Sequence, residues 1–272
     1  MTEIHFTQAS LEDYRICPRR FQLRFILSQP WPAQVTAPEH AYESHMRQGA
    51  ALHRLIQQDL LGMPHERLNE LARDEPLNTW WRRYLEHPPK GLPARKMPEI
   101  ELSTHLEGCR LVGKFDLLAY EPGERFVIVD WKTERRPPSA EKLAARMQSV
   151  LYPFLLVEGG SDYNDGEAIQ PAQVEMIYWF TENPEAPQKF NYSEDVHVEN
   201  RKLLSSLLEE ILMHDEEIFP LTSDERSCLF CNYRSLCKRG VQAGEFDQLE
   251  SGMEDIDPYF ELDFDQVDEV PF

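Results

Sequence analysis

Residues 110–132 read RLVGKFDLLAYEPGERFVIVDWK. This stretch holds two runs rich in aliphatic and aromatic residues, at 110–120 and 125–131, on either side of the turn sequence EPGE at 121–124. Short runs of this kind separated by Pro and Gly are typical of neighbouring strands. A third run, IEL at 100–102, precedes them. We therefore predict an antiparallel meander at the centre of the fold.

Helical patterns surround this meander. Apolar residues at helical spacing predict helices over residues 8–28, interrupted near Cys17-Pro18, and over 41–61, 77–85, 139–157 and 193–217, with a further strand over 172–180. This order favours an α/β fold with a sheet core, a helical N-terminal part and flanking helices. We expect one domain over residues 1–240 and an acidic, disordered tail over residues 241–272.

Two of the predicted strands carry residues that suit a metal-ion site. Asp116 follows Gly113-Lys114-Phe115 in one run, and Asp130-Trp131-Lys132 closes the next. Neighbouring strands can bring both carboxylates to one point, where Mg²⁺ or Mn²⁺ would also accept the backbone carbonyl of Trp131. Strand alternation places Lys132 on the face of Asp130, where its ammonium can position a water nucleophile. An isolated Asp-X-Lys is more often a strand-end cap with a solvated ion pair, so this interpretation needs support elsewhere.

The charge of the chain limits how it can bind a polyanion. The formal net charge is −20, and eleven acidic residues follow Arg239 with no Lys or Arg among them, which leaves −9 for residues 1–239. Any phosphate-binding surface must therefore be a local stripe of basic residues. No apolar run is long enough to span a membrane, and the N-terminus lacks the pattern of a signal peptide. We expect a cytoplasmic protein without a membrane partner, whose cysteines stay reduced.

Four further polar residues are candidates for the same site. His53 lies in a predicted helix within GAALH at 49–53, Glu99 precedes a predicted strand, and Gln148 and Tyr152 lie four residues apart on one helix face. Taken alone, such a histidine is usually a core or surface residue, and the Gln–Tyr pair would be ordinary amphipathic helix. Together with Asp116, Asp130 and Lys132, from about Thr7 to Cys237, they resemble the RecB-like branch of the PD-(D/E)XK nuclease superfamily.

This resemblance implies a central mixed sheet of the restriction-endonuclease-like type and metal-dependent hydrolysis of DNA phosphodiesters. The implied metal ligands are His53, Asp116, Asp130 and the carbonyl of Trp131. The implied catalytic residues are Asp116, Asp130, Lys132 and Glu99, for which Glu101 is a rival, with Gln148 and Tyr152 positioning the strand. We expect exonuclease-type processing of single-stranded or end-opened DNA in repair or recombination. The alternative is a non-catalytic scaffold that binds DNA ends or a protein partner and keeps the nuclease fold.

Four cysteines suggest a second metal centre. Cys228, Cys231 and Cys237 lie within ten residues of one another, and Cys17 lies near the other end of the chain. Reduced thiolates at such spacing suit Zn²⁺ or an iron–sulfur cluster equally well. The arrangement is similar to the 4Fe–4S staple of AddB-type nucleases and CRISPR-associated RecB-like exonucleases, which implies a 4Fe–4S cluster, with Zn²⁺ as the alternative. Cys109 is left over, and we expect it to pack within a strand.

Basic residues gather in the sequence around the cysteines. We consider as a candidate phosphate stripe Arg15, Arg19, Arg20, Arg24, Arg135, Arg136, Arg234, Lys238 and Arg239. For any single one of them, a solvated helix face is the simpler explanation.

The acidic tail ends in Val270-Pro271-Phe272. An acidic run that closes on such residues resembles the C-terminal tip of bacterial single-stranded-DNA-binding proteins. That tip docks its terminal Phe and carboxylate into an apolar pocket with a basic rim on DNA-repair partners. The resemblance implies that the tail binds a repair protein or a helicase subunit, or folds back over the DNA surface of its own chain. A solubilising tail that ends in these residues by chance is the alternative.

Overall fold

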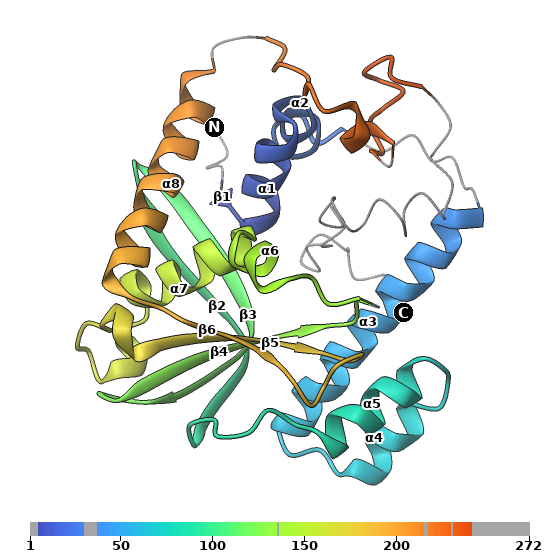
Figure 1. Ribbon diagram of the computed structural model, residues 1–272, viewed down its shortest axis with the longest axis vertical. Coiled ribbons are helices and arrows are strands. Elements are labelled where there is room, and N and C mark those ends of the chain that lie inside the picture. Colours follow the sequence, from blue (N-terminus) through green and yellow to red (C-terminus); the bar gives the residue numbers. More distant parts are fainter. Residues whose placement is uncertain (1–4, 30–36, 135, 215–216, 230, 241–272) are drawn as a thin grey trace.

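The computed structural model describes residues 5–29, 37–134, 136–214, 217–229 and 231–240. In these residues a mixed sheet lies between two layers of helices (Figure 1). The strands are β1 (His5–Phe6), β2 (Arg95–Leu106), β3 (Cys109–Glu121), β4 (Arg125–Lys132), β5 (Val174–Phe180) and β6 (Gln188–Asn191). β2, β3 and β4 form the predicted antiparallel meander, and β5 joins β4 in parallel. β1 pairs in parallel with β3, and β6 is antiparallel to β5.

Helices cover both faces of this sheet. One layer contains α1 (Gln8–Ile16), α2 (Pro18–Phe21), a π-helical turn (Gln22–Ile26), α6 (Ala140–Ala144), α7 (Met147–Gly159) and α8 (Glu194–Met213). The other contains α3 (Ala37–Leu60), α4 (His65–Leu71) and α5 (Leu77–Glu86). Short 3-10 turns lie at Ser161–Asn164, Pro171–Gln173 and Glu225–Cys228. The predicted α/β class, with a mixed sheet and flanking helices, is confirmed.

The apolar runs of the central strands are explained by these two layers. Phe126 and Ile128 of β4 pack into the core beneath α1, α7 and α8, whereas Val127 and Val129 pack into the core beneath α3 and α5. A strand covered on both faces must be apolar at every position, which accounts for the unbroken FVIV of β4.

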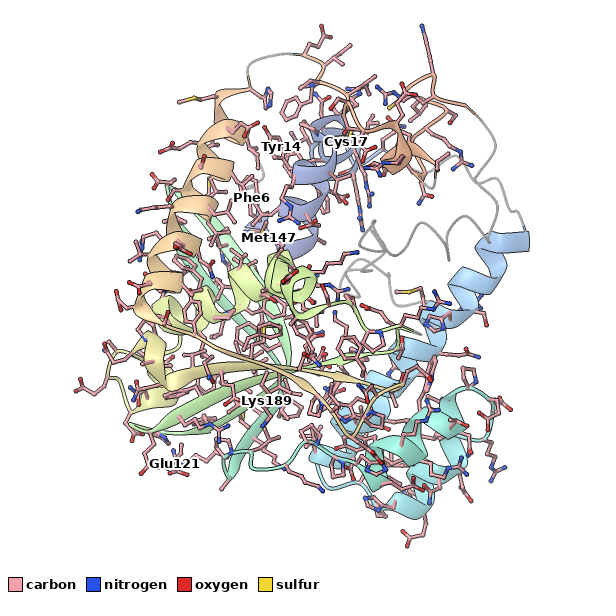
Figure 2. All side chains as sticks on the ribbon, in the orientation of Figure 1. Phe6, Tyr14, Cys17, Glu121, Met147 and Lys189 are labelled. Atoms are coloured by element: carbon pink, nitrogen blue, oxygen red, sulfur yellow. The ribbon has the colours of Figure 1, made fainter. Side chains whose placement is uncertain are left out.

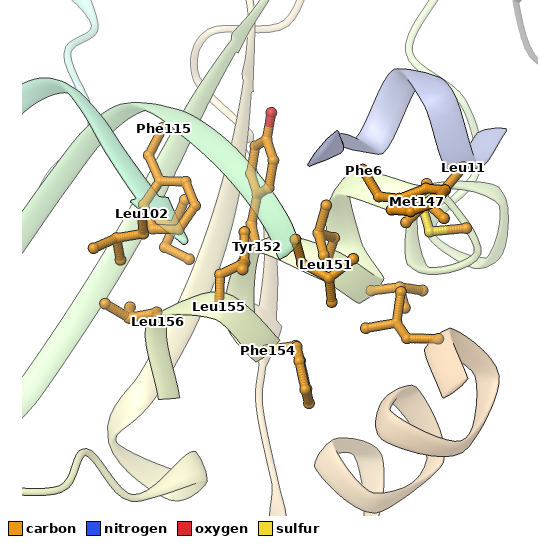
Figure 3. Close-up of a cluster of buried hydrophobic side chains, with 14 of the residues drawn as sticks. Phe6, Leu11, Leu102, Phe115, Met147, Leu151, Tyr152, Phe154, Leu155 and Leu156 are labelled. Carbon is orange, nitrogen blue, oxygen red and sulfur yellow. The ribbon is translucent and has the colours of Figure 1, made fainter. Parts of the chain in front are cut away.

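Gly113 allows α7 to lie directly on β3. A Cβ at this position would stand 2.5 Å from Leu155 Cδ1 and 3.2 Å from the ring of Tyr152, so any side chain here would force these two side chains of α7 to shift. Figure 3 shows Leu151, Tyr152 and Leu155 of α7 against this region, beside Phe115. The glycine of the Gly-Lys-Phe-Asp run therefore sets the distance between the sheet and the helix that bears Gln148 and Tyr152.

β3 and β4 separate at Asp116 and Asp130. Their ladder runs from Glu121↔Arg125 to Leu117↔Val129, and β1 pairs with β3 only farther along, at Arg110 and Leu111. Beyond the last paired residues, the backbone N–H of Trp131 donates instead to Asp116 Oδ2 at 2.8 Å. The regular pairing of β3 and β4 thus ends beside Asp116 and Asp130, the residues that the sequence singled out. We call this place between the two strands the slot.

Element boundaries depart from the predictions where local chemistry intervenes. The predicted interruption near Cys17-Pro18 is confirmed, because Pro18 starts a new helix, whereas the helix predicted over 139–157 breaks between Ala144 and Met147, which was not predicted. β1, β6 and α4 were not predicted, because such short elements carry little periodic signal. No helix among the described residues is long and apolar enough to cross a bilayer. The predicted tail at 241–272 lies outside the described residues.

Candidate metal centre and active site

The slot between β3 and β4 receives a histidine from α3. His53 Nδ1 lies 3.2 Å from Asp116 Oδ1, and His53 Nε2 lies 2.9 Å from the carbonyl oxygen of Trp131. The same Asp116 carboxylate accepts the Trp131 N–H through its other oxygen. The predicted histidine, the predicted aspartate and the predicted backbone carbonyl therefore form one connected group, which joins α3 to both strands.

Glu99 completes a three-residue acidic site. It lies on β2 opposite Asp116, and one ligand atom each from His53, Glu99 and Asp116 lie within 4.8 Å of one another. Glu99 has a φ of 55°, in the left-handed region that is costly for a residue with a side chain. Strand alternation alone would direct Glu99 and Glu101 to the same face. The register of β2 against β3 distinguishes them, because it places Glu99 across from Asp116 and pairs Glu101 with Lys114, where Glu101 is exposed.

The pKa shifts of His53, Glu99 and Asp116 indicate that this group favours a positive charge among its carboxylates. Burial and then the neighbouring Asp116 carboxylate raise the pKa of Glu99 above its usual value, against the opposing charges of Lys114 and His53. Burial disfavours the imidazolium of His53, but the charge and hydrogen bond of Asp116 outweigh it and raise the pKa of His53 to about 9. Burial likewise opposes the ionised form of Asp116, yet His53 and the Trp131 N–H lower the pKa of this carboxyl. Carboxylates this close are stabilised by a cation between them, and a divalent ion fits that demand.

Asp130, Lys132 and Gln148 form a second polar group on the side of α7. Lys132 Nζ lies 3.0 Å from Asp130 Oδ2 and donates to Gln148 Oε1 at 2.8 Å. All three residues are less than a tenth exposed. As predicted, Lys132 and Asp130 share a face of β4. Asp130 lies outside the three-residue group that meets within 4.8 Å, although its charge acts on His53.

Tyr152 lies one helical turn after Gln148 on α7. Its ring is 4.9 Å from that of Phe115, and its hydroxyl points away from the apolar side chains labelled in Figure 3. The structure therefore brings the predicted site residues into two adjoining groups rather than one.

Sequence reasoning missed Lys114, whose Nζ lies 3.3 Å from Glu99 Oε2. Its place two residues before Asp116 on the same strand was the available signal.

The two ends of the described chain meet near Cys17. Gln22 donates to the carbonyl of Glu217 at 2.9 Å and accepts the N–H of Phe219 at 3.0 Å, and the Arg19 N–H donates to Pro220 O at 3.1 Å. The C-terminal segment accordingly lies beside α2 in Figure 1, and Figure 2 shows Tyr14 and Cys17 in this region. These contacts place Cys17 near the late cysteines without any bond between the cysteines themselves.

The cysteine sulfurs are not gathered around a common metal position. Among the described residues no three of them lie within 4.8 Å of one another, whereas four thiolates on one Zn²⁺ lie about 3.8 Å apart. Burial raises the pKa of Cys231 and Cys237, and Cys17 and Cys228 act on both in the same direction. The four thiols are thus close enough to interact electrostatically but do not form a closed site. Cys109 is buried in β3, as expected.

Much of the candidate basic stripe is engaged inside the protein. Arg20 and Arg24 contact the two oxygens of buried Asp13 at 2.8 and 3.1 Å, and each side chain is 12% exposed. Arg234 is buried and donates to the carbonyl of Cys231. The hypothesis that these three arginines face DNA is therefore wrong, because their guanidinium groups are largely removed from solvent. Arg135 lies outside the described residues, whereas Arg136 and Lys238 are exposed.

Comparison with known proteins identifies the family. The chain matches the model of the PD-(D/E)XK nuclease superfamily over residues 5–238. It belongs to this superfamily. Asp130-Trp131-Lys132 fits the (D/E)-X-K pattern in the superfamily's name. Superfamily nucleases use divalent metal ions, for which His53, Glu99 and Asp116 form a candidate acidic site.

The chain is also similar to solved structures. A predicted exonuclease from Eubacterium rectale is similar with a TM-score of 0.54 and 9% identity, over 92% of this chain and 94% of that one. The crystal structure of SSO0001 matches with a TM-score of 0.40 and 13% identity, over 89% of each chain. No curated protein matches the sequence.

Proposed function

We propose that this chain is a metal-dependent DNA nuclease that hydrolyses phosphodiester bonds from the ends of single-stranded or end-opened DNA, in repair or recombination in the cytoplasm. The observation that carries the proposal is the adjacency of two groups at the slot between β3 and β4. The group of His53, Glu99 and Asp116 lies on one side, and the group of Asp130, Lys132 and Gln148 lies on the other. The exonuclease name of the similar Eubacterium rectale protein agrees with this reading.

In this proposal His53, Glu99 and Asp116 hold Mg²⁺ or Mn²⁺, with Asp130 and the Trp131 carbonyl as further oxygen donors. The carboxylate and carbonyl oxygens of this set are the donors that suit Mg²⁺ and Mn²⁺. When bound, such an ion supplies Lewis-acid polarisation of the phosphate and lowers the pKa of a bound water. His53 binds a metal ion as the neutral imidazole. Its contact with Asp116 fixes the orientation of the ring.

Lys132 acts in this proposal on the water and on the charge that develops at phosphorus. Its ammonium is held between Asp130 and Gln148, and its charge already acts on Asp116. A fixed cation in a site with little water stabilises developing negative charge more strongly than one in solvent. Gln148 sets the position of this ammonium, and Tyr152 lies on the same helix face, where its hydroxyl can contact the strand.

The substitution Lys132→Ala should abolish nuclease activity without unfolding the protein. We expect wild type with Mn²⁺ to digest end-labelled linear single-stranded DNA, and the variant to fall about a hundredfold or more in kcat, because it loses charge stabilisation in the transition state. Gel analysis of labelled linear and circular single strands measures both the rate and the need for a free end.

Lys189→Ala is the matched control, since this lysine lies on β6 and pairs with Glu175 at 3.9 Å, away from the site. The control should retain wild-type activity. If purified wild type is as inactive as Lys132→Ala with Mn²⁺, the alternative of a non-catalytic DNA-end or partner-binding scaffold takes its place. Equal activity of the two would remove Lys132 from the mechanism.

Glu99 and Glu101 offer a matched test of the metal site. Glu99→Gln should weaken Mn²⁺ binding about tenfold or more, because it removes a charged ligand, whereas Glu101→Gln makes the same chemical change two residues away on an exposed position. Isothermal titration with Mn²⁺ measures both affinities. Equal affinities in the two variants would remove Glu99 from the ligand set.

We further propose that Cys17, Cys228, Cys231 and Cys237 hold a 4Fe–4S cluster that closes the domain at residues 1–240. A cluster keeps its thiolates farther apart than one Zn²⁺ does, because several metal atoms lie between them. The support for this proposal is the cationic surroundings of the thiols, because the sulfurs themselves do not surround a common position: Arg239 Nη1 lies 3.5 Å from Cys228 Sγ, and the charge of Arg20 acts on Cys231. Cationic groups stabilise the negative charge of metal-bound thiolates.

Protein purified without oxygen should be brown and contain about four iron and four sulfide per chain. Cys231→Ser should lose most of this iron, and Cys109→Ser, the matched control in β3, should keep it. Iron and zinc analysis with visible absorption measures the outcome. A colourless wild type with one zinc per chain would replace the cluster with Zn²⁺.

For the tail at 241–272, which lies outside the described residues, we propose docking of Val270, Pro271 and Phe272 into a basic-rimmed apolar pocket of a DNA-repair protein or helicase subunit. Removal of these three residues should abolish binding to proteins with such pockets, measured by calorimetry. A tail of the same length and charge with these residues moved inward is the control. Unchanged affinity after the deletion would show that the tail serves solubility alone.

A further inference from the structure

Two polar links join the end of β4 to the first turn of α7. Lys132 Nζ donates to Gln148 Oε1 at 2.8 Å. Two residues farther along the chain, Glu134 accepts two hydrogen bonds from Arg146, at 2.9 Å from Nη1 and 3.1 Å from Nη2. Glu134 follows Lys132 by two positions, and Arg146 precedes Gln148 by two. The second link therefore lies beside the first, one step outward from the site.

The link between Glu134 and Arg146, the outer of the two, has a defined geometry. A guanidinium and a carboxylate joined by two parallel hydrogen bonds fix both distance and orientation. The Arg146 side chain is only 5% exposed and that of Glu134 20%, so solvent screens the pair weakly. Arg146 is also the residue at which α7 begins, and no side chain caps this helix end. The first turn of α7 therefore depends on tertiary links for its position.

A further contact holds this turn to the neighbouring strand. Ser149 Oγ lies 2.7 Å from the hydroxyl of Tyr178, which is paired with Asp130 across β4 and β5. Ser149 thus holds the turn near β5, while Arg146 holds it near the segment that follows β4. Gln148 lies between these two attachments, so its amide oxygen is constrained from both sides.

We propose that Glu134 and Arg146 are a positioning pair that fixes the Gln148 amide against the Lys132 ammonium. This inference rests on the proposed nuclease function, in which Lys132 acts at the reacting phosphate. Displacement of a positioned group by about 1 Å can lower a rate by about a hundredfold. Glu134 and Arg146 contact each other, and we infer that both act through Lys132 and Gln148.

Another role for Glu134 follows from the same contact. In this alternative the Glu134 carboxylate fills a phosphate site on Arg146 until DNA displaces it. The burial of the guanidinium argues against this, because a DNA phosphate would have to replace a carboxylate that covers an almost fully enclosed side chain. The two roles predict opposite effects of Glu134→Gln on DNA affinity.

The test is a double-mutant cycle with Glu134→Gln, Arg146→Gln and the combined variant. We expect each single variant to lower kcat about tenfold with less than about a twofold change in KM for single-stranded DNA and in Mn²⁺ affinity. The kcat of the combined variant should be no lower than that of the less active single variant, because each single substitution already breaks the same link. Arg146→Lys, which keeps the charge but not the two parallel bonds, should recover little of the rate.

Glu175→Gln is the matched control. Glu175 Oε2 lies 2.8 Å from Arg125 Nη2 in another carboxylate–guanidinium pair, which joins β4 to β5 at the opposite end of these strands. This variant should retain the wild-type kcat. Melting temperatures of all variants separate a general loss of stability from a loss of position, since a structural role would lower melting in proportion to the loss of activity.

A second readout does not depend on nuclease activity. The ¹⁵N-ammonium signal of Lys132, assigned by its loss in Lys132→Ala, should shift in Glu134→Gln and Arg146→Gln and stay unchanged in Glu175→Gln. An inactive wild type with these shifts would reject the nuclease proposal and keep the positioning pair. Unshifted signals with a wild-type kcat in Glu134→Gln, or tighter DNA binding by that variant, would overturn the positioning pair.

Discussion

The hydrogen bond from the Trp131 N–H to Asp116 is the contact on which the rest of the site depends. At this point a carboxylate replaces the backbone acceptor that a continuous ladder would supply, and β3 and β4 part. Buried backbone donors must be paired, so the strands can separate here only because a side chain accepts this one. The same carboxylate then fixes His53, whose other nitrogen reaches the Trp131 carbonyl.

From this opening, the two helical layers act on one place from opposite sides. α3 supplies His53 from one layer, and α7 supplies Gln148 from the other. The close approach of α7 requires Gly113, because a side chain there would collide with Leu155. Two neighbouring groups result, one rich in carboxylates and one that holds a buried lysine. Each is stabilised by the charges of the other, since His53 responds to Asp130 and Asp116 responds to Lys132.

Several features of this site could be predicted from local pattern. The shared face of Asp130 and Lys132 follows from strand alternation, and the approach of Asp116 to the Asp-X-Lys segment follows from the meander. The choice between Glu99 and Glu101 could not be made in this way, because alternation treats them alike and only the register of β2 against β3 places Glu99 across from Asp116. The assignment of Arg20 and Arg24 to the basic stripe failed for a similar reason: Asp13 lies in the same helical region, but only the folded chain shows that it binds both.

The sequence by itself determined the α/β class, the antiparallel meander, the superfamily pattern and the candidate site residues. These depend on properties that repeat over a few residues: strand alternation, helical spacing and turn chemistry. Only the tertiary structure decided which carboxylates share a site, where the strands part and what holds α7 in place. Those features depend on contacts between distant segments, such as His53 with Trp131 and Glu134 with Arg146. Local pattern carries no information about such distances, because they are set by how whole elements pack.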